Sequence, residues 1–303
     1  MVKYLKRKLH SSKLKVELEG GLGNQLFQYY AGQYFATLYK CEVVYVIQPK
    51  SELSTNSLYV NFELNNFTVS VKYYKLKVLQ ELHRVIRFCI RKFKISQDLW
   101  FWFSGEFRSR VVGFDERLET RKQPKLISGY FQSYRYLPSK LRVNNLPLKN
   151  LSAAYLNLAD KILIDKPIAI HIRGGDYWKY RDSVGILSYR YFADALQLSK
   201  YESSTDKIWL FSNDYGLSQE IKKHLKLITA KEIFENELTS AESMLLMSRA
   251  KRLIISNSTF SWWSAYLVDN PESIIAPETW FRNMTCPSDL IPSSWTQCKS
   301  HWI

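Results

Sequence analysis

One short segment combines residue types that can bind an anion and move a proton. The sequence HIRGGDY, residues 171–177, comes at the end of an apolar run, 168–172. The guanidinium of Arg173 offers a planar fork of donors that suits phosphate oxygens, and the two glycines after it let backbone approach a ligand closely. Asp176 could orient Arg173 or take a proton, although an ion pair that merely closes a turn would explain the same charges. Because that simpler interpretation leaves His171 without a role, the segment indicates a functional site.

Two further polar clusters stand where short apolar runs end. Residues 212–214 (Ser-Asn-Asp) follow the run 208–211, and residues 256–259 (Ser-Asn-Ser-Thr) follow the run 253–255. The second cluster also opens a helical pattern, where hydroxyl and amide side chains usually cap the helix. The same first turn can instead hold a diphosphate, since its N–H groups and the helix dipole both favour an anion. Together with residues 171–177, these make three polar clusters at one sheet edge, which indicates a ligand site.

A glycine-rich loop lies between a strand pattern and a helix pattern near the N-terminus. Residues 20–26 read Gly-Gly-Leu-Gly-Asn-Gln-Leu, and backbone N–H groups in such a loop can face an anion or a sugar hydroxyl. The dinucleotide-binding fingerprint requires a third glycine where this chain has Leu26, so the pattern of nicotinamide and flavin enzymes is not met. A purely structural turn is the alternative interpretation.

Several catalytic signatures are missing from the sequence, among them the P-loop, the nucleophile elbow and H-E-x-x-H. Some glycosyltransferases hold a divalent cation on the sugar nucleotide with an Asp-x-Asp motif. The most similar segment here is Glu235-Asn236-Glu237, which we interpret as a surface patch. Cys286, Cys298 and His301 match no zinc spacing. We therefore expect no metal, and the charge of a departing diphosphate would be balanced by Arg173 and fixed dipoles.

Changes in hydrophobic period indicate the elements that would position these clusters. Apolar runs alternate with helical patterns in the C-terminal half, which is typical of βαβ units in a parallel sheet. The expected strands are 168–172, 208–211, 253–255 and 274–276, and the expected helices are 189–198, 241–250 and 260–268. The N-terminal half begins in the same way, with strand 14–18, helix 24–40 and strand 41–47. The polar stretch 137–166 is the expected connection between two α/β units.

Composition bounds the broad class of the protein. Of 303 residues, 46% are hydrophobic and 15% aromatic, which excludes a disordered or fibrous chain. The net charge of +15 favours anionic partners: phosphorylated substrates, an acidic membrane surface or nucleic acid. Four cysteines without a C-x-x-C pair favour a reducing compartment, and no apolar run reaches the ~18 residues of a membrane span. We therefore expect a cytoplasmic protein.

Residues 77–95 have the pattern of a basic amphipathic helix, with apolar residues at helical spacing and Lys and Arg on the other face. Together with the basic N-terminus, this pattern suggests peripheral docking on anionic lipid at the inner face of the cell membrane. A helix packed on the core with a solvated charged face explains the pattern equally well.

Five ordered blocks, spread over most of the chain, resemble the bacterial α-1,2-fucosyltransferase family, glycosyltransferase family 11. They are GGLGNQLFQYYAGQYFA (20–36), SGYFQSYRYL (128–137), HIRGGDY (171–177), LLMSRAKRLIISNSTFSWWSAYL (245–267) and IIAPETWF (274–281). The resemblance implies an α/β fold of the GT-B type, with two Rossmann-like domains, residues 1–155 and 156–303, facing each other across a cleft. It also implies a metal-independent, inverting enzyme that transfers L-fucose from GDP-fucose to an oligosaccharide.

The same resemblance implies that the C-terminal domain binds the donor and the N-terminal domain the acceptor. Arg173 would hold the β-phosphate and His171 would lie near the nucleotide, while Asp176 is our candidate for the base that deprotonates the acceptor. The other donor-binding candidates are Gly174, Gly175, Asn213, Asp214, Glu242, Ser243, Asn257, Ser258 and Thr259, and the acceptor-side candidates are Gly21, Gly23, Asn24, Gln25 and Gln132. The expected acceptor is a lipid-linked oligosaccharide of a surface polysaccharide, modified at the 2-hydroxyl of galactose.

Three positions depart from the family pattern. The second of two consecutive arginines is Gly174 here, Ser243 stands where an Asp that recognises the guanine edge is expected, and the usual Cys-Lys-His is Ala-Lys-Arg at 250–252. These departures leave room for another sugar nucleotide, and we expect Gly174→Arg to tighten donor binding by restoring a cation. A non-catalytic carbohydrate- or RNA-binding protein would also be basic and rich in aromatics.

Overall fold

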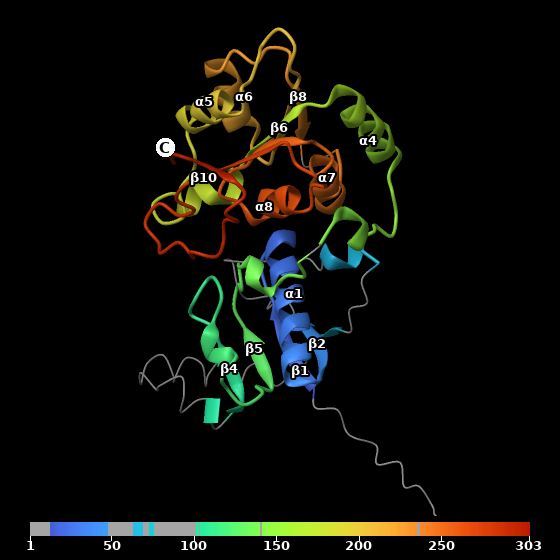
Figure 1. The fold of residues 1–303 in the computed structure, drawn as a ribbon, viewed down its shortest axis with the longest axis vertical. Coiled ribbons are helices and arrows are strands. Elements are labelled where there is room, and N and C mark those ends of the chain that lie inside the picture. The colour runs from blue at the N-terminus through green and yellow to red at the C-terminus, as the bar shows by residue number, and fades with distance from the viewer. Residues whose placement is uncertain are drawn as a thin grey trace, which may run out of the picture.

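The computed structural model describes residues 13–47, 63–68, 73–75, 101–102, 104–139, 141–234 and 237–303. These residues form two parallel β-sheets, each with its own helices, which lie one above the other in Figure 1. The order of strands is β3-β2-β1-β5-β4 in the N-terminal sheet and β11-β10-β9-β6-β7-β8 in the C-terminal sheet. The expected α/β class with two Rossmann-like units in a GT-B arrangement is confirmed. The basic N-terminus and residues 77–95 lie outside the described residues.

The N-terminal unit is built around β1, which pairs in parallel with β2 on one side and with β5 on the other. The bounds are β1 (Lys13–Leu18), α1 (Leu22–Tyr39), β2 (Glu42–Ile47), β3 (Tyr73–Lys75), β4 (Glu106–Arg108) and β5 (Leu126–Ser128), with 3-10 helices η1 (Glu63–Asn66), η2 (Glu116–Leu118), η3 (Tyr134–Tyr136) and η4 (Val143–Asn145). Helix α1 starts directly after Gly21, so most of the glycine-rich segment is already helical.

The C-terminal unit repeats strand and helix as its hydrophobic period predicted. Its elements are α4 (Ala153–Asp165), β6 (Ile168–Ile172), η5 (Gly175–Tyr180), α5 (Tyr189–Leu198), β7 (Ile208–Ser212), α6 (Tyr215–His224), β8 (Lys231–Phe234), α7 (Ser240–Met247), β9 (Arg252–Ile254), α8 (Thr259–Tyr266), β10 (Ser273–Pro277) and β11 (Thr296–Cys298). Every residue of β6 and of β7 is buried, because both strands lie inside the sheet with helices on its faces. Their register, from Ile168 opposite Ile208 to Ile172 opposite Ser212, aligns their carboxyl ends.

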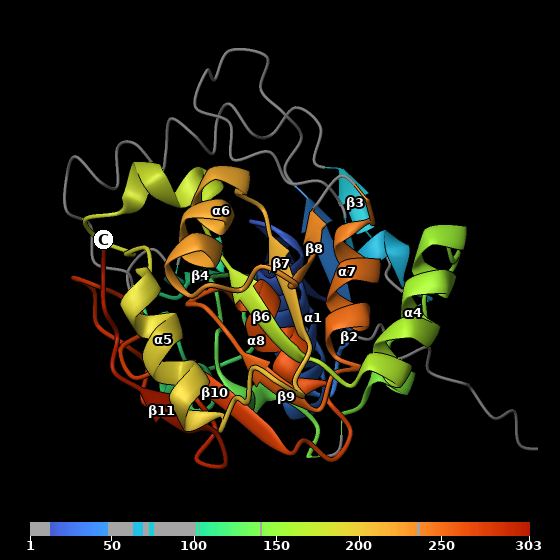
Figure 2. The ribbon, with the colours of Figure 1, turned by 90° about the horizontal axis from the view of Figure 1, so that it is seen from above.

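The expected domain boundary after residue 155 falls inside α4. This helix packs against α7 of the C-terminal unit, and Figure 2 shows the two side by side. Just before α4, the backbone N–H of Ser152 donates to the carboxylate of Glu242 at 2.7 Å. On the N-terminal side, Thr68 N–H donates to the carbonyl of Pro147 at 2.9 Å. The chain therefore changes unit between Pro147 and Ser152.

The two units share one hydrophobic core where α1 meets α8 (Figure 1). The ring of Phe27 lies 4.6 Å from that of Trp262 and 5.0 Å from that of Trp263. The indole N–H of Trp263 donates to the carbonyl of Gly23 at 2.9 Å, and both groups are buried. A Cβ atom at Gly23 would lie 2.5 Å from the carbonyl carbon of Thr259, so only glycine lets the two helices approach this closely.

A second connection runs through residues 287–290 of the C-terminal unit. The carboxylate of Asp289 accepts the hydroxyl of Ser133 at 2.6 Å, and its carbonyl accepts the N–H of Tyr134 at 3.2 Å. The next carbonyl, that of Leu290, accepts the indole N–H of Trp262 at 2.7 Å. This segment thus ties the N-terminal unit to α8.

No helix within the described ranges is long and apolar enough to cross a membrane.

Gly23 in α1 and Gly21 at its N-cap test the shared core. Gly23→Ala should lower the free energy of unfolding by about 1–3 kcal/mol, because the added methyl group overlaps the backbone of α8. Gly21→Ala is the matched control: a Cβ there meets nothing within 4 Å, so we expect only the loss of about 0.5–1 kcal/mol that alanine costs at the N-cap of a helix. Denaturant unfolding measures both changes, and equal values for the two variants would contradict the contact.

Candidate active site

A pocket opens at the carboxyl edge of the C-terminal sheet. It contains about 360 Å³ of space free of protein atoms, part of it open to solvent. Its walls come from the ends of β6 and β7 and from the first turns of α7 and α8. The lining residues are His171, Arg173, Phe211, Ser212, Asn213, Leu238, Ser240, Ser243 and Phe260. The structure therefore brings the clusters after β6 and β7 together at one edge, the place where parallel α/β sheets bind ligands.

Arg173 is held from two sides at this edge. Its Nη2 donates to the carboxylate of Asp176 at 2.5 Å, and its guanidinium carbon lies 4.8 Å from the centre of the Tyr177 ring. The hydroxyl of Tyr177 donates to the carbonyl of Asn257 at 3.2 Å, which links the loop to the start of α8. The ion pair that the sequence suggested thus exists, and it orients a cation that lines the pocket. Sequence reasoning missed Tyr177, although an aromatic ring four residues after an arginine was a usable signal.

His171 is a neutral imidazole in this setting. Its side chain is buried, its Nδ1 lies 2.7 Å from the hydroxyl oxygen of Ser256, and its ring lies 5.2 Å from that of Phe260. Burial, reinforced by the charge of Arg173, lowers the pKa of His171 to about 3. An imidazole with this pKa can hydrogen-bond a ligand, but it holds a proton too weakly to serve as the base near neutral pH.

Asn213 and Asp214 face the loop after β6. The amide oxygen of Asn213 accepts the N–H of Gly174 at 3.0 Å, and the carboxylate of Asp214 accepts the N–H of Gly175 at 2.9 Å and the indole N–H of Trp178 at 2.7 Å. Burial raises the pKa of Asp214, but these donors outweigh it and the pKa lies below its usual value. Both residues were predicted to bind the donor directly; the structure places Asp214 under the loop as its support, and only Asn213 also lines the pocket.

The close support leaves no room for a side chain at position 174. A Cβ atom at Gly174 would lie 2.3 Å from a carboxylate oxygen of Asp214 and 2.6 Å from its Cβ. In place of the expectation that an arginine here tightens donor binding, this geometry predicts that the arginine would displace the loop. Gly175 has a φ of +59°, and its added Cβ would meet the amide nitrogen of Asn213 at 2.6 Å.

The three predicted residues at the start of α8, Asn257, Ser258 and Thr259, have different roles. The amide nitrogen of Asn257 donates to the carbonyls of Val184 and Gly185 at 3.1 and 3.2 Å, while its buried Oδ1 has no hydrogen-bond partner within the described residues. Ser258 is the N-cap residue, but its side chain makes no capping bond. Thr259 packs against Gly23 in the shared core. None of the three lines the pocket, to which α8 contributes Phe260 instead.

The two predicted residues of α7 point in different directions. Ser243 lines the pocket together with Ser240. The carboxylate of Glu242 accepts the N–H of Thr239 at 3.0 Å and that of Ser152 at 2.7 Å. Burial raises the pKa of Glu242, yet these N–H donors lower it more, so the side chain is ionised. The prediction that Glu242 binds the donor is corrected: it caps α7 and anchors the connection between the units.

Most of the acceptor-side candidates support the N-terminal unit. Gln25 is fully buried, Gly23 lies in the shared core, and the amide nitrogen of Gln132 donates to the amide oxygen of Asn24 at 3.0 Å. This last bond joins α1 to the loop after β5. Gly21 has open space beside it, and Asn24 is partly exposed. Gly23 and Gln25 are therefore structural residues, contrary to their prediction as acceptor contacts.

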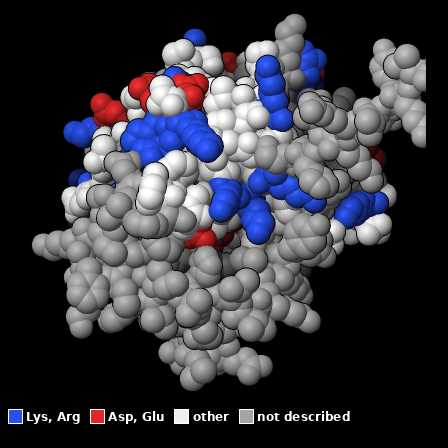
Figure 3. Space-filling model, turned by 90° about the horizontal axis from the view of Figure 1, so that it is seen from below, with Lys and Arg blue, Asp and Glu red and all other residues white. Residues whose placement is uncertain are grey.

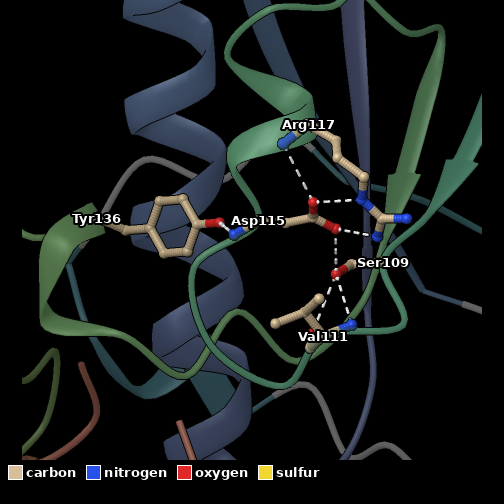
Figure 4. Close-up of polar contacts among 5 residues, drawn as sticks. All are labelled: Ser109, Val111, Asp115, Arg117 and Tyr136. Atoms are coloured by element: carbon tan, nitrogen blue, oxygen red, sulfur yellow. Dashed lines mark hydrogen bonds and ion pairs between the residues drawn. The ribbon is translucent and has the colours of Figure 1, made fainter. Parts of the chain in front are cut away.

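Asp115 links three segments of the N-terminal unit, through Ser109 after β4, Arg117 in η2 and Tyr136 in η3 (Figure 4). It accepts the hydroxyl of Ser109 at 2.7 Å and two bonds from the guanidinium of Arg117 at 2.8 and 2.7 Å. The backbone N–H of Asp115 donates to the hydroxyl of Tyr136 at 2.9 Å. Burial raises the pKa of Asp115, but the bonds from Arg117 and Ser109 outweigh this effect, so the pKa lies below its usual value. No sequence signal pointed to this network.

Among the described residues, no three His, Cys, Asp or Glu side chains gather as a metal site would require. The sulfur of Cys286 lies 3.2 Å from the backbone nitrogen of Trp280, and His301 lies 2.9 Å from the carboxylate of Asp194. Cys298 is buried in β11. Glu235 and Asn236 lie outside the described residues.

One family model matches almost the whole chain. The family model described as "Glycosyl transferase family 11" matches residues 13–296. An α-1,2-colitosyltransferase of Escherichia coli is 28% identical over 295 residues, which cover 92% of this chain and 97% of that protein. The O-antigen biosynthesis glycosyltransferase WbnK of Escherichia coli is 27% identical over 300 residues, covering 92% and 98%. Among solved structures, the α-1,6-fucosyltransferase NodZ co-crystallised with GDP matches with a TM-score of 0.49 and 13% identity, over 86% of this chain and 96% of that one.

The contact between Gly174 and Asp214 gives a direct test of the loop. Gly174→Arg should weaken nucleotide binding roughly tenfold, because moving the loop away from Asp214 also moves Arg173. Gly216→Ala is the matched control, since a Cβ there meets Asp214 only at 3.7 Å, and its affinity should stay unchanged. Calorimetric titration with GDP measures both. Tighter binding by Gly174→Arg would restore the original expectation.

Proposed function

Because this chain belongs to glycosyl transferase family 11, we propose that it transfers L-fucose from GDP-fucose to an oligosaccharide, forming an α-1,2 linkage to galactose. The observation that carries the proposal is the oriented Arg173 in a pocket at the carboxyl edge of the C-terminal sheet. Two relatives named for sugar transfer, one of them for an α-1,2 linkage, support the reaction class. The word O-antigen in the name of the other supports a surface polysaccharide as the acceptor.

The proposed reaction is an in-line displacement at the anomeric carbon. The oxygen of the acceptor hydroxyl attacks C1 from the face opposite the diphosphate, the bond from C1 to the phosphate oxygen breaks, and its electron pair stays on GDP. A base takes the hydroxyl proton. Arg173 and the first turns of α7 and α8 would stabilise the charge that grows on the diphosphate. We propose that this requires no metal ion, since a guanidinium and two helix starts already supply positive potential at the pocket.

The role of Asp176 follows from its contact with Arg173. The ion pair at 2.5 Å commits one carboxylate oxygen to the guanidinium. We therefore propose that Asp176 positions Arg173, in place of the role as base that the sequence suggested. Serines 240 and 243, which line the pocket beside Arg173, are the proposed contacts for the rest of the nucleotide.

A second donor is favoured by one specific observation, the name of the relative that transfers colitose. Colitose is fucose without its 3-hydroxyl. A pocket that hydrogen-bonds this hydroxyl rejects the deoxy sugar strongly, whereas a pocket that leaves it in solvent accepts both. Comparing transfer rates from GDP-fucose and GDP-colitose decides between the two donors.

Nucleotide binding and one substitution test the proposed function together. GDP should raise the melting temperature, because at 100 times its Kd it adds about 2.7 kcal/mol to the free energy of unfolding. UDP, CMP and NAD should leave the melting temperature unchanged. Transfer should persist in EDTA. Arg173→Ala should keep the fold but lower kcat by roughly 10²- to 10³-fold, because the leaving group loses its cation.

The control for this variant is Arg190→Ala, which removes an exposed arginine on α5. We expect its kcat to match that of the wild type. Stabilisation by UDP instead of GDP would exclude the proposed donor, and loss of transfer in EDTA would exclude the metal-free reaction. Near-normal transfer by Arg173→Ala would remove the proposed role of the guanidinium.

We also propose peripheral contact with the inner face of an anionic membrane. The net charge of +15 supports it, and Figure 3 shows that Lys and Arg predominate among the charged side chains described on the lower face of the N-terminal unit. Sedimentation with vesicles should show binding to anionic lipid that weakens as salt rises. Equal binding to neutral and anionic vesicles would contradict the proposal.

A further inference from the structure

The loop between η5 and α5 is bonded to Asn257, just before α8. The amide nitrogen of Asn257 donates to the carbonyls of Val184 and Gly185 at 3.1 and 3.2 Å. Its backbone carbonyl accepts the hydroxyl of Tyr177 at 3.2 Å. The ring of Tyr177 in turn lies 4.8 Å from the guanidinium carbon of Arg173. Asn257, which is buried, therefore connects this loop to the aromatic ring beside Arg173.

The second half of the same loop runs antiparallel to residues 301–303. Three backbone contacts join the two segments: the bridge between Leu187 and Trp302, the bond from the N–H of Ser188 to the carbonyl of His301 at 2.7 Å, and the bond from the N–H of Ile303 to the carbonyl of Ile186 at 2.9 Å. The imidazole of His301 also lies 2.9 Å from the carboxylate of Asp194 on α5. Residues 301–303 are thus fixed to the C-terminal unit and hold this part of the loop.

The indole of Trp302 lies directly against the backbone of Gly185. A Cβ atom at Gly185 would meet Cε3 of Trp302 at 2.5 Å, and φ at this glycine is +87°. A side chain here would therefore be strained and would push the indole away. Trp302 also packs on the hydrophobic core that contains Ile186 and Leu187. The backbone that offers its carbonyls to Asn257 is thus held in place by an aromatic ring.

The segment after β10 fastens the first half of the loop. The N–H of Arg282 donates to the carbonyl of Val184 at 3.2 Å, so this carbonyl accepts a bond from Arg282 as well as from Asn257. The guanidinium of Arg282 donates to the carbonyl of Ile303 at 2.6 Å, which joins the two supporting segments. The loop is therefore held by residues after β10 and after β11, and a displacement of either support reaches Asn257 through bonded backbone.

We propose that Trp302 is a positioning residue for the transfer reaction, although it does not line the pocket. It fixes the loop whose carbonyls hold Asn257. Asn257 then fixes Tyr177, and Tyr177 supports the guanidinium of Arg173. This inference rests on the function proposed above, in which Arg173 stabilises the charge that grows on the diphosphate. A cation does this best when it is oriented before the charge develops, so its support contributes to the rate.

Substitution of Trp302 tests this role through a split between kcat and KM. Trp302→Leu keeps apolar volume on the core but removes the flat ring from Gly185. With GDP-fucose and methyl β-D-galactopyranoside it should lower kcat roughly 5- to 20-fold, because Arg173 loses its orientation. The KM for the galactoside should stay within about twofold of the wild-type value. Trp302→Phe restores a ring and should return kcat to within about threefold of the wild type. Rates are taken well below the melting temperature of each variant, so that kcat refers to folded protein.

A double-mutant cycle with Tyr177 tests the route. Tyr177→Phe removes the hydroxyl bond to the carbonyl of Asn257 but keeps the ring beside Arg173. By itself it should lower kcat roughly 3- to 10-fold, the effect of one lost hydrogen bond. In this background Trp302→Leu should lower kcat by no more than about a further twofold, because the connection is already cut. A tryptophan that acts on the rate by another route would give effects that multiply.

Lys299→Ala is the matched control, because Lys299 is exposed in the same segment and its variant should have the kcat of the wild type. An unchanged kcat in Trp302→Leu, or effects that multiply in the cycle, would overturn the positioning role alone, since the wild-type protein would still bind GDP and transfer the sugar. Absence of transfer or of stabilisation by GDP in the wild-type protein would instead overturn the proposed function, on which the inference rests.

Discussion

The loop that follows β6 depends on two side chains from the end of β7. Asn213 and Asp214 accept the N–H groups of Gly174 and Gly175, so the backbone after Arg173 is held by polar bonds between neighbouring strands. A partly buried carboxylate such as that of Asp214 is costly unless donors surround it, and here the donors belong to the loop itself. The orientation of the guanidinium therefore depends on the aligned ends of two parallel strands. Asp176 and Tyr177 then fix its remaining freedom.

Polar groups that sequence reasoning assigns to a ligand divide into two sets in the folded protein. One set lines the pocket: His171, Arg173, Asn213 and Ser243. The other set holds the walls in place, as Asp214 does for the loop and Glu242 does for the start of α7. Both sets occupy the same sheet edge, since a pocket at the ends of strands needs capped helices and braced turns around it. Proximity to the edge thus predicts involvement in the site, and hydrogen-bond partners decide the role.

The sequence predicted the α/β class and the main strands of the C-terminal unit, because a buried central strand such as IAIHI in β6 needs an apolar run on both faces. The edge strand β11 and the 3-10 helix η5 were not predicted, since neither has a distinct hydrophobic period. For the site, Arg173 could be predicted from its residue type and its place after a strand. The roles of Gly23 and Gln25 could not, because they depend on contacts with Thr259 and with η1, which are distant in sequence.

The shared core between α1 and α8 has a consequence for how this chain can change during evolution. The carbonyl of Gly23 and the indole of Trp263 form one buried bond across the boundary, and the rings of Phe27 and Trp262 pack beside it. The four residues of this contact lie in the two blocks that carry the family resemblance, 20–36 and 245–267. Changes of sugar specificity that leave the two units joined are therefore expected to fall in the pocket and its loops, away from this contact.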